Sequence, residues 1–191
     1  MRSRILTLAG LLFLSLAFFC CKKESPAVDE SPFFEFFNES SIVIDTVKQS
    51  ADAWEYGFVF SPLKDGKITQ FSVKLPATGN FTVTLWDVST TTPVVLGSKI
   101  VSAADINVSA SDNIPEIAVK KGGKYGITVL SDAFFRITKT GGENFAFPRT
   151  IGNINILSFN EAVNNSNAPA FPATSNAARV APCVNVIFIA D

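Results

Sequence analysis

The feature that most constrains this fold is a series of nine short runs of alternating or β-branched residues. Runs of this kind are typical of strands that bury one face, and no stretch shows the longer apolar period of an amphipathic helix. The sequence therefore predicts an all-β protein, a jelly-roll-like antiparallel β-sandwich of two sheets and about nine strands. The runs cover residues 41–47, 55–60, 67–75, 81–87, 94–101, 116–120, 124–130, 134–139 and 184–190.

Glycine turns separate several of these runs. KDGK at 64–67, ATGN at 77–80 and KGGK at 121–124 each supply a glycine for the positive φ that tight turns require. The chain has 191 residues, of which 47% are hydrophobic, and this suits one domain with a substantial core. Phenylalanine contributes 18 residues against two tyrosines and two tryptophans, so most of the aromatic mass is expected to be buried.

Charge and histidine content argue against several classes of function. The formal net charge is −1, and such a surface lacks the basic patch that nucleic-acid binding normally requires. The chain contains no histidine, which removes the commonest general base and the imidazole ligands of catalytic zinc. We therefore expect a non-catalytic protein without a cofactor or metal. A hydrolase would have to use two opposed carboxylates, and no such pair stands out in the sequence.

The first twenty residues predict an export signal. Two arginines precede an apolar run from Ile5 to Phe19, and a cysteine pair follows. The run is shorter than the roughly 20 residues that a membrane span needs. The pattern predicts a lipoprotein-type signal peptide over residues 1–20 with Cys21 as the lipidated residue, and a plain secretory signal or an uncleaved anchor is the alternative. The expected location is the bacterial outer membrane, on its periplasmic or its surface side.

A tether and a single domain are predicted to follow the signal. Residues 21–31 are polar and contain Pro26, so we expect a flexible linker before a domain at residues 32–191. If Cys21 carries lipid and Cys20 is removed, Cys183 has no cysteine to pair with. Cys183 lies in an apolar run, and a small buried thiol is the expected role.

Two aromatic-rich segments lie outside the nine runs. Residues 33–37 hold four phenylalanines, of which one pair is expected to enter the core and the other to be covered by a loop. A docking patch for a partner is the sharper alternative, because exposed contiguous aromatic residues usually mark an interface. Residues 139–182 are rich in Gly, Asn, Ala and Pro, and they are predicted to form a long loop of the kind on which binding residues concentrate.

Three sequence patterns follow one another in the domain: E-x-G-x-x-F at residues 55–60, DG-x-I-T at 65–69 and G-x-F-x-V-x-LWD at 79–87. With these patterns the chain resembles a family of bacterial extracellular β-sandwich domains of unknown function. The resemblance spans about residues 54 to 189, and it implies a sandwich fold in a cell-surface or polysaccharide context. One departure is Asn185, where the family usually has aspartate. The matching residues here are Glu55, Gly57, Phe60, Asp65, Gly66, Ile68, Thr69, Gly79, Phe81, Val83, Leu85, Trp86 and Asp87.

Trp86 is the leading candidate for ligand contact. In the run 81–87 the odd positions are apolar, so Thr84 and Trp86 should face away from the core. An outward Trp86 beside threonine hydroxyls would suit a sugar ring, whereas a Trp86 covered by the 139–182 loop would be structural. The alternation alone leaves both interpretations open, and the high average burial of tryptophan favours the second.

The remaining candidates lie in the long segment. Arg149 and Arg179 could bind a carboxylate or an acidic sugar, with Phe147 nearby, or they could simply hold the segment in place. Asp65, Asp112 and Asp132 near turns raise calcium as a minor option. The sequence favours an extracellular glycan-binding module, and a structural or protein-interaction lipoprotein of a surface assembly is the alternative. In both cases the only membrane contact is the lipid anchor, and no nucleic acid is involved.

Overall fold

The computed structural model describes residues 28–49, 52–166 and 168–191, and within them the protein is all-β. Every strand pair described is antiparallel. The predicted signal peptide, Cys21 and most of the tether lie outside the described residues. The ladders and core contacts that the structure describes all lie within these residues.

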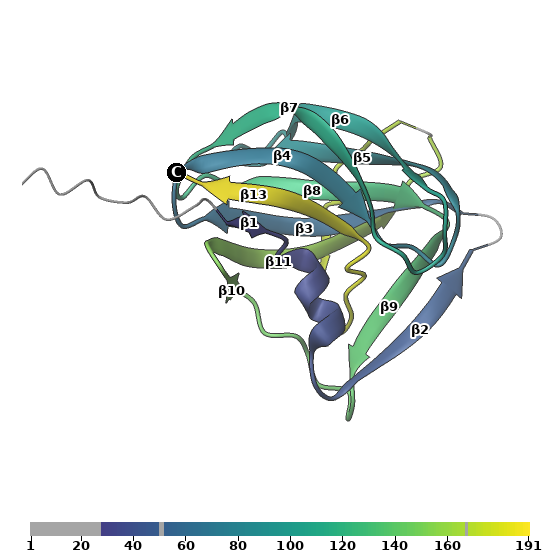
Figure 1. Cartoon of the computed structure of the whole chain (residues 1–191). Helices are drawn as coiled ribbons and strands as arrows, with labels where there is room; N and C mark the ends of the chain where they lie inside the picture. Colours follow the sequence, from purple (N-terminus) through teal and green to yellow (C-terminus); the bar gives the residue numbers. More distant parts are fainter. Residues whose placement is uncertain (1–27, 50–51, 167) are drawn as a thin grey trace, which may run out of the picture.

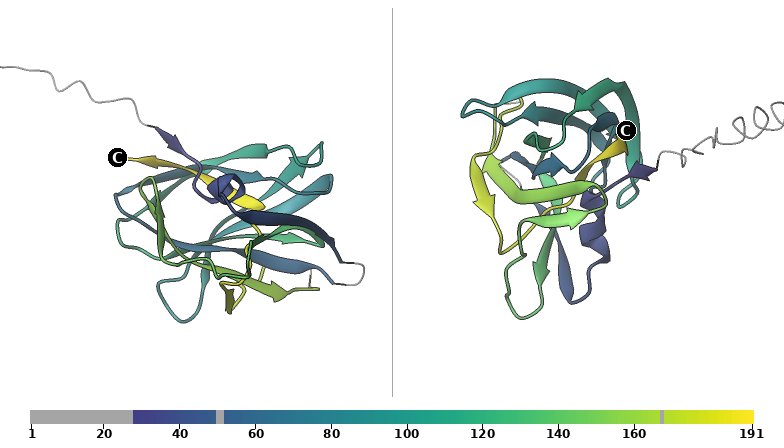
Figure 2. Two further views of the ribbon diagram at one scale, coloured as in Figure 1. Left: turned by 90° about the horizontal axis from the view of Figure 1, so that it is seen from below. Right: turned by 90° about the vertical axis from the view of Figure 1, so that its left-hand side faces the viewer.

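Two sheets face each other around the core, and a two-stranded ribbon projects from one side (Figures 1 and 2). The smaller sheet has the order β1 (Asp29–Glu30), β13 (Val184–Ala190), β4 (Gly66–Val73) and β7 (Ala110–Val119). The larger sheet has the order β10 (Arg149–Ile151), β11 (Ile154–Val163), β3 (Trp54–Pro62), β8 (Tyr125–Ser131), β5 (Gly79–Asp87) and β6 (Val94–Ala103), with β12 (Thr174–Asn176) also paired to β11. The ribbon pairs β2 (Ile42–Lys48) with β9 (Ala133–Lys139).

The predicted all-β sandwich is confirmed in outline, but the strands number 13 rather than about nine. Three of the additional strands lie in residues 139–182, so the prediction of one long loop there is wrong. β11 alone spans ten of those residues and pairs along its length with β3. The fourth additional strand, the two-residue β1, places Asp29 and Glu30 opposite Ile189 and Phe188, so the predicted tether ends three residues early.

The segment 33–37 forms a short 3₁₀ helix, η1 (Phe33–Asn38). In a 3₁₀ helix residues three apart lie on the same side, so Phe33 and Phe36 share one side and Phe34 and Phe37 another. Phe33 and Phe36 are fully buried, and both stack on Phe58 of β3 with ring centroids 4.9 and 5.2 Å apart. The prediction that one pair enters the core is confirmed, and Phe34 and Phe37 are half-buried. A docking patch that uses all four phenylalanines is therefore excluded, whereas one formed by Phe34 and Phe37 stays a prediction.

Candidate functional site

Trp86 lies on the outer face of the larger sheet and is nevertheless covered. On β5 the core side holds Phe81, Val83 and Leu85, as the alternation predicts. Thr84 and Trp86 belong to the opposite face, yet they are only 0% and 5% exposed. The interpretation of Trp86 as a covered residue is confirmed. The prediction that Trp86 and Thr84 form an open platform is wrong, because neither side chain presents a surface to a ligand.

A chain of buried hydrogen bonds begins at Trp86. Its indole Nε1–H donates to Thr128 Oγ1 at 2.9 Å, and the Thr128 hydroxyl donates to Glu55 Oε1 at 2.6 Å. The geometry follows from strand order, because β8 carries Thr128 between β5 and β3. The buried polar groups of Trp86, Thr128 and Glu55 therefore each have a hydrogen-bond partner, as buried polar groups require.

The second carboxylate oxygen of Glu55 holds the segment that covers this face, residues 164–166 and 168–173, which we call the cover loop. Glu55 Oε2 accepts from Asn164 Nδ2 at 2.9 Å and from the backbone N–H of Ala170 at 3.2 Å. Asn160 on β11 adds a third tie by donating from Nδ2 to the Pro172 carbonyl at 3.1 Å. The Glu55 side chain thus joins Thr128 of β8 to both halves of the cover loop.

Burial raises the pKa of Glu55, and the hydrogen bonds that it accepts from Thr128, Asn164 and Ala170 lower the pKa in part. Glu55 itself is 1% exposed. Its ionised form depends on all three donors, because water cannot replace a missing one at this depth. Loss of any one donor would leave part of a buried charge uncompensated.

Phe171 is the residue through which the cover loop contacts Trp86. The two rings meet edge to face, with centroids 5.8 Å apart and planes at 70°. Gly126 of β8 lies directly under Phe171, and a Cβ there would stand 2.4 Å from the Phe171 ring. The sheet therefore needs glycine at this position so that the ring can approach.

Beside Phe171 the outer face is hollowed into a depression of about 410 Å³, which we call the Phe171 depression. Its lining includes Val59, Thr90, Thr91, Pro93, Lys124 and Phe171. The wall is fixed in place because the Val88 N–H donates to the Lys124 carbonyl at 3.0 Å. The Lys124 ammonium has no carboxylate partner among the described residues. One aromatic residue, two threonines and a lysine therefore line one open hollow.

The other predicted ligand residues lie in two further places and hold the fold together. Arg149 forms an ion pair with Glu39 and lies 4.8 Å over the ring of Phe36, against which Phe147 also packs. Arg179 donates from Nη2 and Nε to Glu161 Oε1 at 2.6 and 3.0 Å. The five predicted residues thus form three separate groups, with Trp86 and Thr84 in the first, Arg149 and Phe147 in the second and Arg179 in the third.

The two buried carboxylates of the larger sheet lie on opposite faces. Across the β3–β11 ladder Glu161 stands opposite Tyr56, whereas Ala162 stands opposite Glu55. Residues opposite one another share a face, so Glu161 shares the face of Tyr56, and Glu55 occupies the other face. Glu55 and Glu161 therefore do not face each other across a common hollow.

Cys183 is fully buried, as predicted, and its Sγ accepts from the Phe135 N–H at 3.2 Å. Burial raises the pKa of this thiol to about 12. Asp65 accepts from Lys120 Nζ and from the Lys121 N–H, which closes a turn. In the described part of the chain no group of three or more acidic, cysteine or histidine side chains is placed to hold a metal ion.

Sequence reasoning missed the residues that build this site. Glu55 and Phe171 were visible as a charge inside a strand run and an aromatic residue in the long segment, but their contacts were not. Within the described residues no helix has the length and apolar character to cross a membrane. Searches against family models, curated proteins and solved structures found no match to this chain. The resemblance to extracellular β-sandwich domains therefore stays a prediction.

Proposed function

We propose that this chain is a non-catalytic, lipid-anchored module of the cell envelope, jelly-roll-like in topology, that binds extracellular glycan in the Phe171 depression. The observation that carries the proposal is the combination of Phe171, Thr91 and Lys124 around a hollow of about 410 Å³. Hollows of roughly 300–1,000 Å³ are the usual size of small-ligand sites. An aromatic ring packs on the apolar face of a sugar, while hydroxyl and ammonium groups bind its oxygens.

In this proposal Trp86 supports the site from below. It holds Phe171 through the edge-to-face contact, and the Glu55 network holds the cover loop on which Phe171 sits. A site whose ring is fixed before binding loses less conformational entropy when a ligand arrives. The buried tryptophan therefore contributes to recognition without contacting the ligand.

The test uses Trp86 as a reporter of its neighbour Phe171. Residues 28–191 carrying Trp54→Phe, which leaves Trp86 as the single tryptophan, are titrated with neutral hexose oligosaccharides and with uronic-acid oligosaccharides. We expect a saturable fluorescence change that Phe171→Ala abolishes and that Lys124→Ala weakens for the acidic set. Ile100→Thr is the matched control, because Ile100 is exposed on β6 outside the hollow.

Two results would count against the proposal. One is the absence of a saturable change with every oligosaccharide in the panel. The other is unchanged binding by Phe171→Ala, provided that circular dichroism shows the variant to be folded. The alternative, a protein-interaction role in a surface assembly, is supported by a free strand edge on β2 that is separate from the Phe171 depression.

A further inference from the structure

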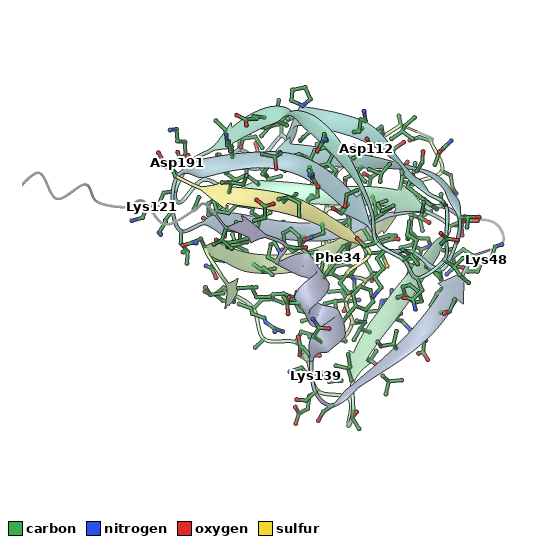
Figure 3. The ribbon with its side chains drawn as sticks, viewed as in Figure 1. Phe34, Lys48, Asp112, Lys121, Lys139 and Asp191 are labelled. Atoms are coloured by element: carbon green, nitrogen blue, oxygen red, sulfur yellow. The ribbon has the colours of Figure 1, made fainter. Side chains whose placement is uncertain are left out.

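The ribbon strand β2 has an unpaired backbone edge. β2 pairs with β9 without interruption from Ile42 to Lys48, and among the described residues it pairs with no other strand. It lies at the periphery of the molecule in Figure 1, and Lys48 and Lys139 mark the two ends of the ribbon in Figure 3. Such an edge presents free N–H and C=O groups that can pair with another strand.

The hydrogen bonds that flank the ladder tell which β2 residues carry these free groups. The Gln49 N–H donates to the Asp132 carbonyl, and the Thr140 N–H donates to the Ser41 carbonyl. Antiparallel pairs alternate between bonded and non-bonded, so the odd-numbered residues from 41 to 49 point their backbone groups at β9. The backbone groups of Ile42, Ile44, Thr46 and Lys48 therefore point outward, to the free edge.

The outer edge of β9 is occupied, because Val180 bridges to Ile137 and the Phe135 N–H donates to Cys183 Sγ. The remaining sheet edges in the described part of the chain are protected against such pairing. β1 has two residues, and β10 and β12 have three each. β7 carries Pro115 and a register shift against β4, and β6 has a register shift against β5 and lies beside β7. Short strands, prolines and bulges are the usual means of blunting an edge. β2 is seven residues long and has neither a proline nor a shift.

The side chains of β2 suit a covering strand. Val43 on one face and Ile44 on the other are each 46% exposed, although both are apolar. Asp45 lies on the face of Val43, where its Oδ2 accepts from Arg136 Nη2 at 2.9 Å. Its other oxygen, Oδ1, has no hydrogen-bond partner among the described residues. A strand added to β2 would therefore meet an apolar residue and a half-satisfied carboxylate on one face.

A second copy of the chain is a poor occupant. Two identical antiparallel strands are related by a two-fold axis perpendicular to the sheet, and opposite residues must share a face, so one residue must stand opposite its own copy across the axis. In the register that uses all seven residues of β2 this residue is Asp45, and two Asp45 carboxylates then stand directly opposite. Like charges directly opposite destabilise a strand pair, so the full-length register is disfavoured.

We propose that β2 is a docking edge for an extended segment of another protein that places Lys or Arg opposite Asp45, between apolar residues opposite Val43 and Val47. The outward backbone groups supply the ladder bonds. The basic side chain reaches Asp45 Oδ1, and the flanking apolar side chains cover Val43. The recognition mode is strand addition, in which the backbone provides affinity and alternate side chains provide specificity.

The experiment uses a symmetric probe that presents the same pattern in either chain direction. The blocked peptide Thr-Val-Thr-Lys-Thr-Val-Thr is titrated to millimolar concentration into ¹⁵N-labelled residues 28–191, and amide shifts are followed by NMR. We expect saturable shifts at Ile42, Ile44, Thr46 and Lys48. The same peptide with Glu in place of Lys should bind more weakly by about fivefold, since a repulsive cross-strand charge pair replaces an attractive one.

Two variants separate edge pairing from an effect on the fold. Thr46→Pro removes one outward N–H and leaves the bonds to β9 in place, so it should abolish the shifts while the variant stays folded. Asp45→Asn should bind both peptides equally. The proposal is overturned if β2 shows no saturable shift, or if the wild type binds both peptides equally. It is also overturned if the chain alone self-associates in a manner that Thr46→Pro prevents, because the occupant is then a second copy.

Discussion

Thr128→Val tests whether the hydrogen-bond chain on the outer face stabilises the fold. Valine keeps the shape of threonine, so the change removes little except the hydroxyl that links Trp86 to Glu55. It leaves the Trp86 N–H without an acceptor and Glu55 Oε1 without a donor. An unsatisfied buried group costs about 1–3 kcal/mol, and more when it is charged. We therefore expect Thr128→Val to lower the free energy of unfolding by about 3–5 kcal/mol.

Thr84→Val is the matched control because Thr84 stands directly opposite Thr128 in the β5–β8 ladder and is equally buried. Its hydroxyl shares a single 3.1 Å hydrogen bond with Ser98, whose Oγ also contacts the Val83 carbonyl. Ser98 is exposed and can turn to water, so Thr84→Val should cost about 1 kcal/mol or less. Thr128→Ser keeps the hydroxyl and should lose about 1 kcal/mol for the buried methyl group.

The assay is urea unfolding of residues 28–191, followed by circular dichroism and by tryptophan fluorescence. In a domain of this size each kcal/mol shifts the melting temperature by about 2–4 °C, so thermal scans should separate the valine variants clearly. The reasoning is refuted if Thr128→Val is no less stable than Thr84→Val. It is also refuted if Thr128→Ser is as unstable as Thr128→Val, since the hydroxyl would then not be the relevant group.

Three further changes test other contacts. Gly126→Ala places a Cβ 2.4 Å from the Phe171 ring, so it should displace that ring, shift the Trp86 emission maximum and cost about 1–3 kcal/mol in urea unfolding; unchanged emission would contradict the contact. Arg179→Met removes the cation that pairs with the Glu161 carboxylate, whose side chain is 8% exposed, and it should cost about 2 kcal/mol in the same assay. A loss near zero would show that the hydrogen bond from Asn176 is enough to hold the Glu161 carboxylate. In the folded protein the pKa of Cys183 is raised to about 12 from its ordinary value of 9.0. Its contribution to stability is therefore complete below pH 9 and is lost as the pH rises towards 12. Cys183→Ala should flatten that alkaline loss of stability, and a pH profile identical to that of the wild type would refute the assignment.

Local pattern predicted much of the fold because most strands here bury one face. The alternation of residues 81–87 correctly assigned Phe81, Val83 and Leu85 to the core. The same logic failed for β11, whose register shifts between Ile156 and Ser158. The shift changes which residues face the core, so the apolar period breaks in the middle of the strand and the segment reads as a loop.

The candidate site was less predictable because its contacts connect distant parts of the chain. Glu55 is 73 residues from Thr128, 109 from Asn164 and 115 from Ala170. No local pattern carries such pairings. What the sequence did contain was a glutamate at the start of an apolar strand run, and a buried carboxylate requires several donors. That requirement predicts partners for Glu55 without identifying them.

The same loop that covers Trp86 also creates the Phe171 depression, so the stability of the network and the proposed binding are linked. Thr128 lines no part of that depression, and Thr128→Val can therefore change glycan affinity only by changing how Phe171 is held. If the variant leaves the cover loop closed for only a fraction of the time, the apparent dissociation constant rises by the inverse of that fraction. Thr84→Val, which leaves the network intact, should bind as the wild type does. Equal affinity of the wild type and a folded Thr128→Val would mean that the depression does not depend on the network, and the support assigned to Trp86 and Glu55 would have to be abandoned.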